Sequence, residues 1–299
     1  MNEEKRLIVL VGPTAVGKTA VAIQLAEHFK TEIISADSRQ IYRELEIGTA
    51  KPSEQELKQI RHHFINTHSI EQTYDAGSYE RDALERIDEL FKKYDTLILC
   101  GGSGLYVKAV LEGFDEMPEI PAGTRAKIMN EYELKGLTWL QEKVREVDPD
   151  YFSEVDIKNP HRLVRALELH AAKGKPLKEL RTKRKVNRPF EVVKIGLEVE
   201  REELYHRIDV RMDKMIANGL FEEAEQLYPK QNLNALQTVG YREIFGYLEE
   251  QYDKEEAIRL LKRNSRRYAK RQLTWFKRDR EIKWFNPNQV TEMISLLSS

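Results

Sequence analysis

The chain has 299 residues, of which 40% are hydrophobic and a single one is cysteine, and its formal net charge is −1. This length predicts two domains or one large domain with an insertion, and the apolar content excludes wholesale disorder. The lone Cys100 excludes an internal disulfide framework, and the lack of a long apolar run excludes a secretory leader or membrane span, so we expect a soluble cytoplasmic protein.

The first elements in chain order alternate between strands and helices. Short apolar runs predict buried strands at residues 7–11, 32–35 and 96–100. Apolar residues at helical spacing predict helices at 20–26, 78–93 and 105–111. Strands that alternate with helices favour an α/β fold with a parallel sheet.

The pattern changes near residue 118. Amphipathic helical runs occupy residues 124–180, strand-like alternation returns at 191–200, and the chain is helical again from 201. The sequence therefore predicts a P-loop-type α/β core formed by residues 1–117 and 191–299, with a helical C-terminal part. It also predicts an all-helical insertion domain over residues 118–190.

Basic residues gather in two windows. Residues 158–188 hold 11 basic and 2 acidic residues, and residues 261–280 hold 9 basic and 1 acidic residue. These windows carry +9 and +8, so the rest of the chain carries −18. Such segregation indicates either a polyanionic partner such as nucleic acid or two solvated helix faces.

A glycine-rich loop with a complete phosphate-binding motif follows the first predicted strand and opens the first predicted helix. Its residues are Gly12, Pro13, Thr14, Ala15, Val16, Gly17, Lys18 and Thr19, which fit G-x-x-x-x-G-K-[ST]. The backbone amides, the helix N-terminus and the Lys18 ammonium favour an anion, and the Thr19 hydroxyl suits a magnesium ion. The motif predicts a diphosphate site without saying whose diphosphate it is.

Two further positions lie at the carboxyl ends of predicted strands, near the expected ligand crevice. Asp37 follows the second strand and suits a general base or a magnesium ligand, or simply caps the next helix. The strand at 96–100 ends in Gly101-Gly102-Ser103-Gly104, with no carboxylate where a P-loop NTPase usually has one. This absence argues against an ordinary kinase or ATPase and leaves Ser103 as a hydroxyl beside the crevice.

Basic residues also share helix faces in the last third of the chain. Arg207 and Arg211 are four residues apart, so they share a face and are either a phosphate clamp or a surface pair. A second stripe places Arg263, Arg267, Lys270 and Arg271 on one side of a helix that ends in Trp275-Phe276. Basic and aromatic residues interleave in this way on nucleic-acid surfaces, although the aromatics also suit a core.

Taken together, these segments resemble the tRNA dimethylallyltransferase (tRNA isopentenyltransferase) family. The resemblance covers nearly the whole chain in family order. Its segments are GPTAVGKT at 12–19, SADSRQIY at 35–42, IGTAKP at 47–52, HHFI at 62–65, GGSGLY at 101–106, NPHRLVRALE at 159–168, VGYRE at 239–243 and RRYAKRQLTWF at 266–276.

The resemblance implies a prenyl transfer. A dimethylallyl group would move from dimethylallyl diphosphate to the exocyclic amine of the adenosine on the 3′ side of the anticodon, with Mg²⁺ as cofactor and diphosphate as leaving group. The loop amides and Lys18 would stabilise the negative charge that develops on the diphosphate. The target base would flip out of its stack to reach the crevice.

The resemblance also implies site roles. Asp37 would be the general base, Ser103 would contact the adenosine or the leaving group, and Arg207 and Arg211 would lie near the diphosphate. Contacts to tRNA would come from Asp37, Ser38, Arg39, Gln40, Ser103, Arg125, His161, Arg162, Leu163, Val164 and Arg165. Ser103 and His161 stand where the family usually has threonine and glutamine, and serine lacks the methyl group that restricts the threonine rotamer.

Three other functions compete with this interpretation. A P-loop small-molecule kinase explains the phosphate loop and Asp37 but not the basic windows or the missing strand-end acid. An isopentenyltransferase for free adenine nucleotides shares the chemistry but needs no RNA-binding insertion. A non-catalytic RNA-binding protein does not need intact Lys18, Thr19 and Asp37. We expect a monomer, because the chain has no long exposed heptad pattern.

Overall fold

The computed structural model describes residues 5–114, 118–180 and 186–298. It divides into a core unit, residues 1–111 with 187–299, and a helical unit, residues 112–186. The boundary expected at residue 117 lies outside the described residues, and so do residues 181–185 of the first basic window.

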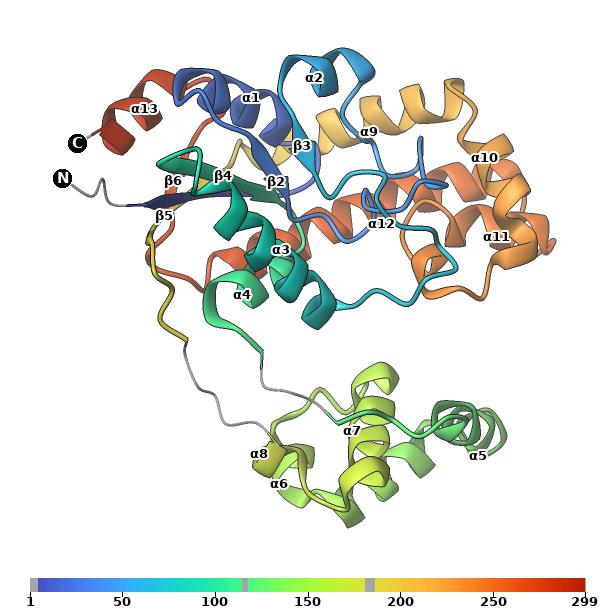
Figure 1. Ribbon diagram of the computed structural model, residues 1–299. Coiled ribbons are helices and arrows are strands. Elements are labelled where there is room, and N and C mark those ends of the chain that lie inside the picture. Colours follow the sequence, from blue (N-terminus) through green and yellow to red (C-terminus); the bar gives the residue numbers. More distant parts are fainter. Residues whose placement is uncertain (1–4, 115–117, 181–185, 299) are drawn as a thin grey trace. The chain divides into compact units, whose positions relative to one another are not determined.

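The core unit is built on one six-stranded sheet in which every strand pair is parallel, with the order β3-β2-β4-β1-β5-β6 (Figure 1). The strands are β1 (Arg6–Val11), β2 (Ile33–Ser35), β3 (His62–His63), β4 (Thr96–Gly101), β5 (Glu191–Leu197) and β6 (Lys283–Phe285). The central strand β1 pairs with β4 through Leu10 and Cys100 and with β5 through Leu10 and Ile195. The predicted α/β fold with a parallel sheet is therefore confirmed.

Helices cover both faces of this sheet because the β1 side chains alternate between two cores. Leu7 and Val9 pack with α3 (Ala76–Leu90) and α4 (Gly104–Glu112) on one face. Ile8 and Leu10 pack with α1 (Lys18–His28) and α13 (Val290–Ser298) on the other. Strands buried on both faces read as continuous apolar runs, which is why the sequence predicted them.

The remaining helices of the core unit follow β2 and β5. They are α2 (Glu54–Gln59), α9 (Arg201–Ala217), α10 (Leu220–Leu227), α11 (Arg242–Leu248) and the long α12 (Lys254–Phe276), with short 3₁₀ turns η1 (Tyr228–Lys230) and η2 (Asn234–Leu236). Asn218-Gly219 and Gly240 lie between these helices. The strand β6 interrupts the last third, where the sequence pattern predicts helices alone, and the pattern predicts no strand at β3 either.

The helical unit has its own small core. Its helices are α5 (Thr124–Val147), α6 (Pro149–Glu154), α7 (Pro160–Lys173) and α8 (Leu177–Leu180). Leu140 and Val144 of α5 pack against Leu163 and Leu167 of α7. The backbone of α5 is kinked at Gly136, which has a left-handed φ of 76°. Within the described ranges, no helix of either unit is long and apolar enough to cross a membrane.

Candidate active site

The phosphate-binding loop lies between the end of β1 and the start of α1. Gly17 has a φ of +108°, a conformation that strains residues with a side chain, and it allows α1 to begin at Lys18. The first turn of α1 therefore directs N–H groups without helical acceptors out of the helix end. This is the anion-binding geometry that the motif predicts.

The charged group of this loop is buried. The Lys18 ammonium donates hydrogen bonds to the backbone carbonyls of Gly12 (3.0 Å) and Pro13 (2.7 Å). Burial lowers the pKa of Lys18 to about 8, although Asp37 and Cys100 oppose this shift. A buried cation held only by neutral carbonyls is poised to pair with an incoming anion.

A cavity of about 380 Å³ opens above this loop. The phosphate loop contributes five of the lining residues, and the others come from α1, β2, α2, β3, β4, α9, α12 and the loops after β2 and β3. The lining includes Thr14, Ala15, Gly17, Lys18, Thr19, Asp37, Gln40, Thr49, Ala50, Lys51, Pro52, Cys100, Gly101, Arg211, Tyr268 and Gln272. Gly12, Pro13 and Val16 do not line the cavity, and they shape the loop behind it.

The two predicted clamp arginines have different positions. Arg211 lines the cavity, donates to the Thr14 hydroxyl at 2.6 Å, and keeps a buried Nε with no partner among the described residues. Arg207 does not line the cavity: it donates to the Val16 carbonyl at 3.1 Å and pairs with Glu203. The structure therefore brings Arg211 to the cavity beside the phosphate-binding loop, whereas Arg207 supports the loop backbone.

Asp37 lies just beyond β2 and lines the same cavity. Its Oδ1 accepts the backbone N–H groups of Arg39 (2.9 Å) and Gln40 (3.2 Å). Asp37 thus caps a turn and not a helix, because the next helix begins only at Glu54, and this contact uses one carboxylate oxygen. Oδ2 has no hydrogen-bond partner within the described part of the chain and is available to a substrate.

Ser103 lies beside a second cavity of about 470 Å³, which Ser38, Arg39 and Tyr106 also line. The Ser103 Oγ accepts the Ser38 N–H at 2.9 Å and lies 3.1 Å from the Ser38 hydroxyl. Despite lacking the threonine methyl, this hydroxyl is therefore fixed by two contacts. Through them it holds the segment that carries Asp37.

Two residues of α12 border both cavities. The sequence pattern does not predict them as site residues. Gln272 is buried, accepts the Thr14 N–H at 2.8 Å and donates to the Gly102 carbonyl at 2.9 Å. Tyr268 lies beside it in both linings, and burial raises its pKa to about 12. The basic stripe on the outer face of α12 was visible in the sequence, whereas these inner-face contacts depend on tertiary packing.

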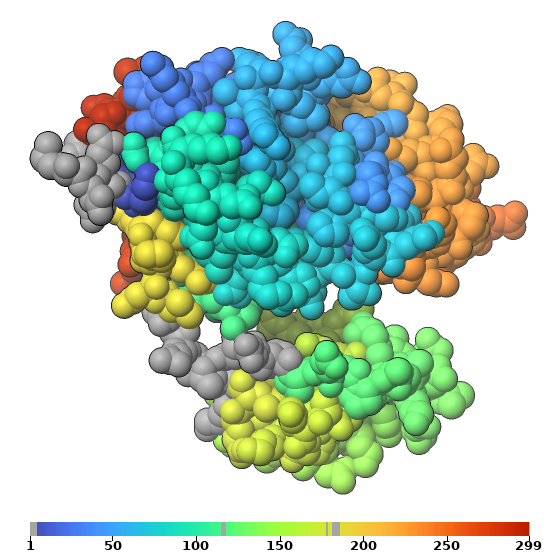
Figure 2. All heavy atoms as spheres, viewed as in Figure 1, coloured from blue at the N-terminus to red at the C-terminus, as the bar shows by residue number. Residues whose placement is uncertain are grey.

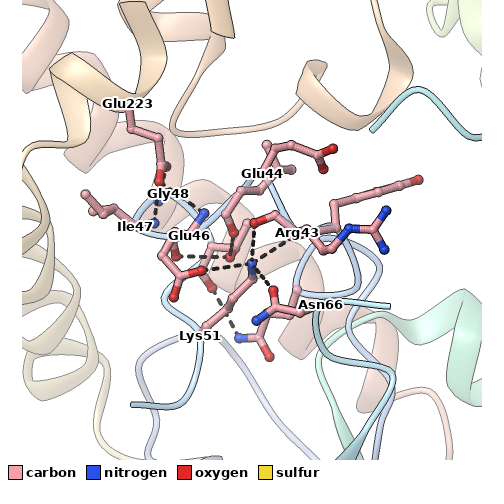
Figure 3. A network of polar contacts seen from close by, with 12 residues as sticks. Arg43, Glu44, Glu46, Ile47, Gly48, Lys51, Asn66 and Glu223 are labelled. Carbon is pink, nitrogen blue, oxygen red and sulfur yellow. Dashed lines mark hydrogen bonds and ion pairs between the residues drawn. The ribbon is translucent and has the colours of Figure 1, made fainter. Parts of the chain in front are cut away.

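The wall of the first cavity at residues 49–52 is anchored from α10 (Figure 3). The Glu223 carboxylate accepts the N–H groups of Glu46 (3.0 Å), Ile47 (2.7 Å) and Gly48 (2.8 Å), and also the Tyr241 hydroxyl (2.7 Å). In the space-filling view, the light-blue chain around these loop residues lies against orange residues of α10 and α11 (Figure 2).

The same loop is tied internally. Lys51 donates to the Tyr42 carbonyl at 2.8 Å and to the Asn66 side chain. Gln40 donates to the carbonyls of Thr49 (3.2 Å) and Ala50 (3.1 Å). Gly48 is required because a Cβ there would lie 2.4 Å from the Tyr241 ring. These contacts connect the Glu223 anchor to the segment of Asp37 and Gln40.

We expect Glu223→Gln to loosen this wall. An amide has one acceptor oxygen and directs an NH₂ group at backbone N–H donors, so it leaves partly buried donors unpaired, at a cost of at most about 1–3 kcal/mol. Binding of inorganic diphosphate should weaken, because residues 49–52 line the cavity beside the phosphate-binding loop. Titration of the folded variant with inorganic diphosphate measures this, and an unchanged affinity would contradict it. Glu222→Gln, one residue away on α10, is the matched control.

The helical unit carries the other predicted contact residues. Arg125, His161, Arg162 and Arg165 are exposed on α5 and α7. Leu163 and Val164 are 0% and 1% exposed and belong to the core of the unit. The expectation that these two side chains touch RNA is therefore corrected, because the helical period turns them inward.

The chain is similar to known proteins over most of its length. The family model described as IPP transferase matches residues 40–279. The chain is similar to tRNA dimethylallyltransferase of Cytophaga hutchinsonii, with 50% identity over 99% of this chain and 97% of that protein. The corresponding protein of Christiangramia forsetii is 49% identical over 96% and 95%.

Solved structures agree with this relationship. The tRNA isopentenylpyrophosphate transferase of Bacillus halodurans has a TM-score of 0.73 and 34% identity, and the match covers 99% of this chain and 96% of that one. A eukaryotic dimethylallyltransferase described as acting on tRNA has a TM-score of 0.71 and 27% identity, covering 91% and 70%.

Proposed function

Because the chain belongs to the IPP transferase family, we propose that it transfers a dimethylallyl group from dimethylallyl diphosphate to the exocyclic amine of the adenosine on the 3′ side of the tRNA anticodon. The observation that carries this proposal is the pair of adjoining cavities. One is lined by phosphate-loop residues and Arg211, the other by Ser38, Arg39 and Ser103, and Tyr268 and Gln272 border both.

The first cavity suits the diphosphate of the donor. Lys18 and Arg211 are buried cations that face it, and the unpartnered Nε of Arg211 leaves a guanidinium N–H for an anion. As the allylic carbon–oxygen bond breaks, negative charge develops on the leaving diphosphate. These two cations and the helix N-terminus stabilise that charge.

Asp37 suits the acceptor amine. The adenine N6 forms the new bond to the allylic carbon, the carbon–oxygen bond to diphosphate breaks, and the N6 proton passes to Asp37. The carboxylate oxygen that caps the loop keeps Asp37 in place, and the other oxygen accepts the proton. The absence of a carboxylate at the end of β4, where Gly101-Gly102-Ser103 lies, disfavours the kinase alternative.

Magnesium fits the donor set of this cavity. Thr19 supplies a hydroxyl, and the described residues contain no group of three or more His, Cys, Asp or Glu that could hold a metal ion by themselves. Magnesium is commonly held by one or two protein groups together with substrate phosphates and waters. It would neutralise diphosphate charge there. Chelation with EDTA is expected to abolish transfer, and added magnesium to restore it; full activity in EDTA would contradict the assignment.

Contacts to the RNA are assigned to both units. In the core unit, Ser38, Arg39 and Gln40 flank Asp37, and Arg267, Lys270 and Arg271 lie on the outer face of α12. In the helical unit, Arg125, His161, Arg162 and Arg165 are exposed. Single-stranded loops are where RNA bases can be reached, and an extruded adenosine suits a cavity beside a phosphate crevice.

The proposal is tested by incubating the protein with labelled dimethylallyl diphosphate, magnesium and an anticodon stem-loop. We expect label in the RNA and release of diphosphate. No label in any of several adenosine-bearing stem-loops, together with ATP-dependent phosphorylation of a small substrate, would replace this function with that of a kinase.

A further inference from the structure

A buried carboxylate in the helical unit lies between two arginines from different helices. Glu168 of α7 is 3% exposed. Its Oε1 accepts from Arg125 of α5 at 2.9 Å, and its Oε2 accepts from Arg165, one turn earlier on α7, at 3.3 Å. Each carboxylate oxygen thus takes one guanidinium.

The arginines themselves face solvent. The side chains of Arg125 and Arg165 are 57% and 48% exposed, whereas that of Glu168 is 4% exposed. A guanidinium has five N–H donors, so most donors of both arginines remain available after this contact. Arg162 lies one turn before Arg165 on α7, at the helical spacing that puts both on the same face.

The charge arrangement has a consequence for an anionic ligand. Two arginines brought this close would repel each other, and the buried carboxylate offsets that repulsion while fixing where each guanidinium points. The cluster keeps a net charge of +1. Arginine binds phosphate oxygens through paired N–H groups, so fixed guanidinium planes bind better than two mobile side chains.

We propose that Glu168 is a positioning residue that holds Arg125 and Arg165 in register for the phosphate backbone of the RNA. This rests on the proposed function, because the ligand is the tRNA acceptor. Glu168 touches neither the RNA nor the reacting atoms. It acts through the two arginines.

The sign of one charge change separates this role from simple electrostatics. Glu168→Gln removes a negative charge, so charge counting alone predicts tighter binding to a polyanion. Positioning predicts weaker binding, because glutamine keeps one acceptor oxygen and can no longer hold both guanidiniums. We expect the dissociation constant for the anticodon stem-loop to rise about tenfold, with the Michaelis constant for dimethylallyl diphosphate unchanged.

A matched control removes the same charge elsewhere on the unit. Glu146 is exposed near the end of α5 and pairs with Lys143. Glu146→Gln should leave RNA binding unchanged or slightly tighter. A second variant, Glu168→Asp, keeps the charge but shortens the side chain by one methylene, so it cannot reach both arginines. It should also weaken RNA binding, and it decides the question if Glu168→Gln does not fold.

A double-mutant cycle with Arg125→Gln identifies the route. If Glu168 acts through Arg125, the double variant should bind RNA about as weakly as the single variant that binds more weakly. The two losses of affinity should not multiply. The inference is overturned if folded Glu168 variants bind RNA as well as the wild type or better, and the wild type still transfers the prenyl group. Failure of the wild type to bind or prenylate any stem-loop would instead overturn the proposed function.

Discussion

Asp37→Asn is expected to slow prenyl transfer about 10²- to 10⁴-fold while leaving binding of both substrates nearly unchanged. Asparagine keeps the side-chain oxygen that caps the N–H groups of Arg39 and Gln40, so the loop should hold its shape. What it loses is the basic oxygen that accepts the N6 proton. Single-turnover rates of label transfer at saturating substrates measure the chemical step directly.

Two comparison variants make this result specific. Asp37→Ala removes the loop cap as well as the base, so it should weaken RNA binding in addition to slowing transfer. Asp213→Asn, on the exposed side of α9 where Asp213 pairs with Lys262, should leave the rate unchanged. A normal single-turnover rate for Asp37→Asn would exclude Asp37 as the general base.

Lys18→Met is expected to reduce the turnover number about 10²- to 10³-fold. Methionine preserves much of the aliphatic length and removes the ammonium that faces the diphosphate. The loss should appear in turnover as well as in donor affinity, because negative charge on the diphosphate grows as the carbon–oxygen bond breaks. Steady-state kinetics with the donor varied gives both parameters.

The control for Lys18 removes a lysine that does not face the cavity. Lys214 is exposed near the end of α9, and Lys214→Met should leave both parameters unchanged. RNA binding by Lys18→Met should also match the wild type, since Lys18 lies in the donor cavity. A Lys18→Met protein with full turnover would mean that the loop does not hold the leaving group.

Much of the fold was predictable because its signals are local. The strands β1 and β4 are buried on both faces and read as unbroken apolar runs, and the phosphate loop is a contiguous motif between a strand and a helix. The strands β3 and β6 were missed for the opposite reason. They have two and three residues and form the two edges of the sheet, so they are only partly buried and lack the apolar run that marks the equally short but fully buried β2.

The site was less predictable where it depends on contacts between distant residues. Gln272 bonds to Thr14 across 258 positions of sequence, and Glu223 bonds to Gly48 across 175. Neither contact leaves a pattern in one sequence. Leu163 and Val164 show a different limit: a motif can mark a whole segment, but the helical period decides which of its side chains reach the surface.

Transfer to the adenosine beside the anticodon is tested by locating the modification in the RNA. An anticodon stem-loop is incubated with the wild-type protein, magnesium and dimethylallyl diphosphate, digested to nucleosides and analysed by mass spectrometry, with free AMP as the competing acceptor. We expect one N6-dimethylallyl adenosine per stem-loop, at the position 3′ to the anticodon, its loss when that position is replaced by guanosine, and no modified AMP. Prenylated AMP alongside unmodified RNA would contradict it.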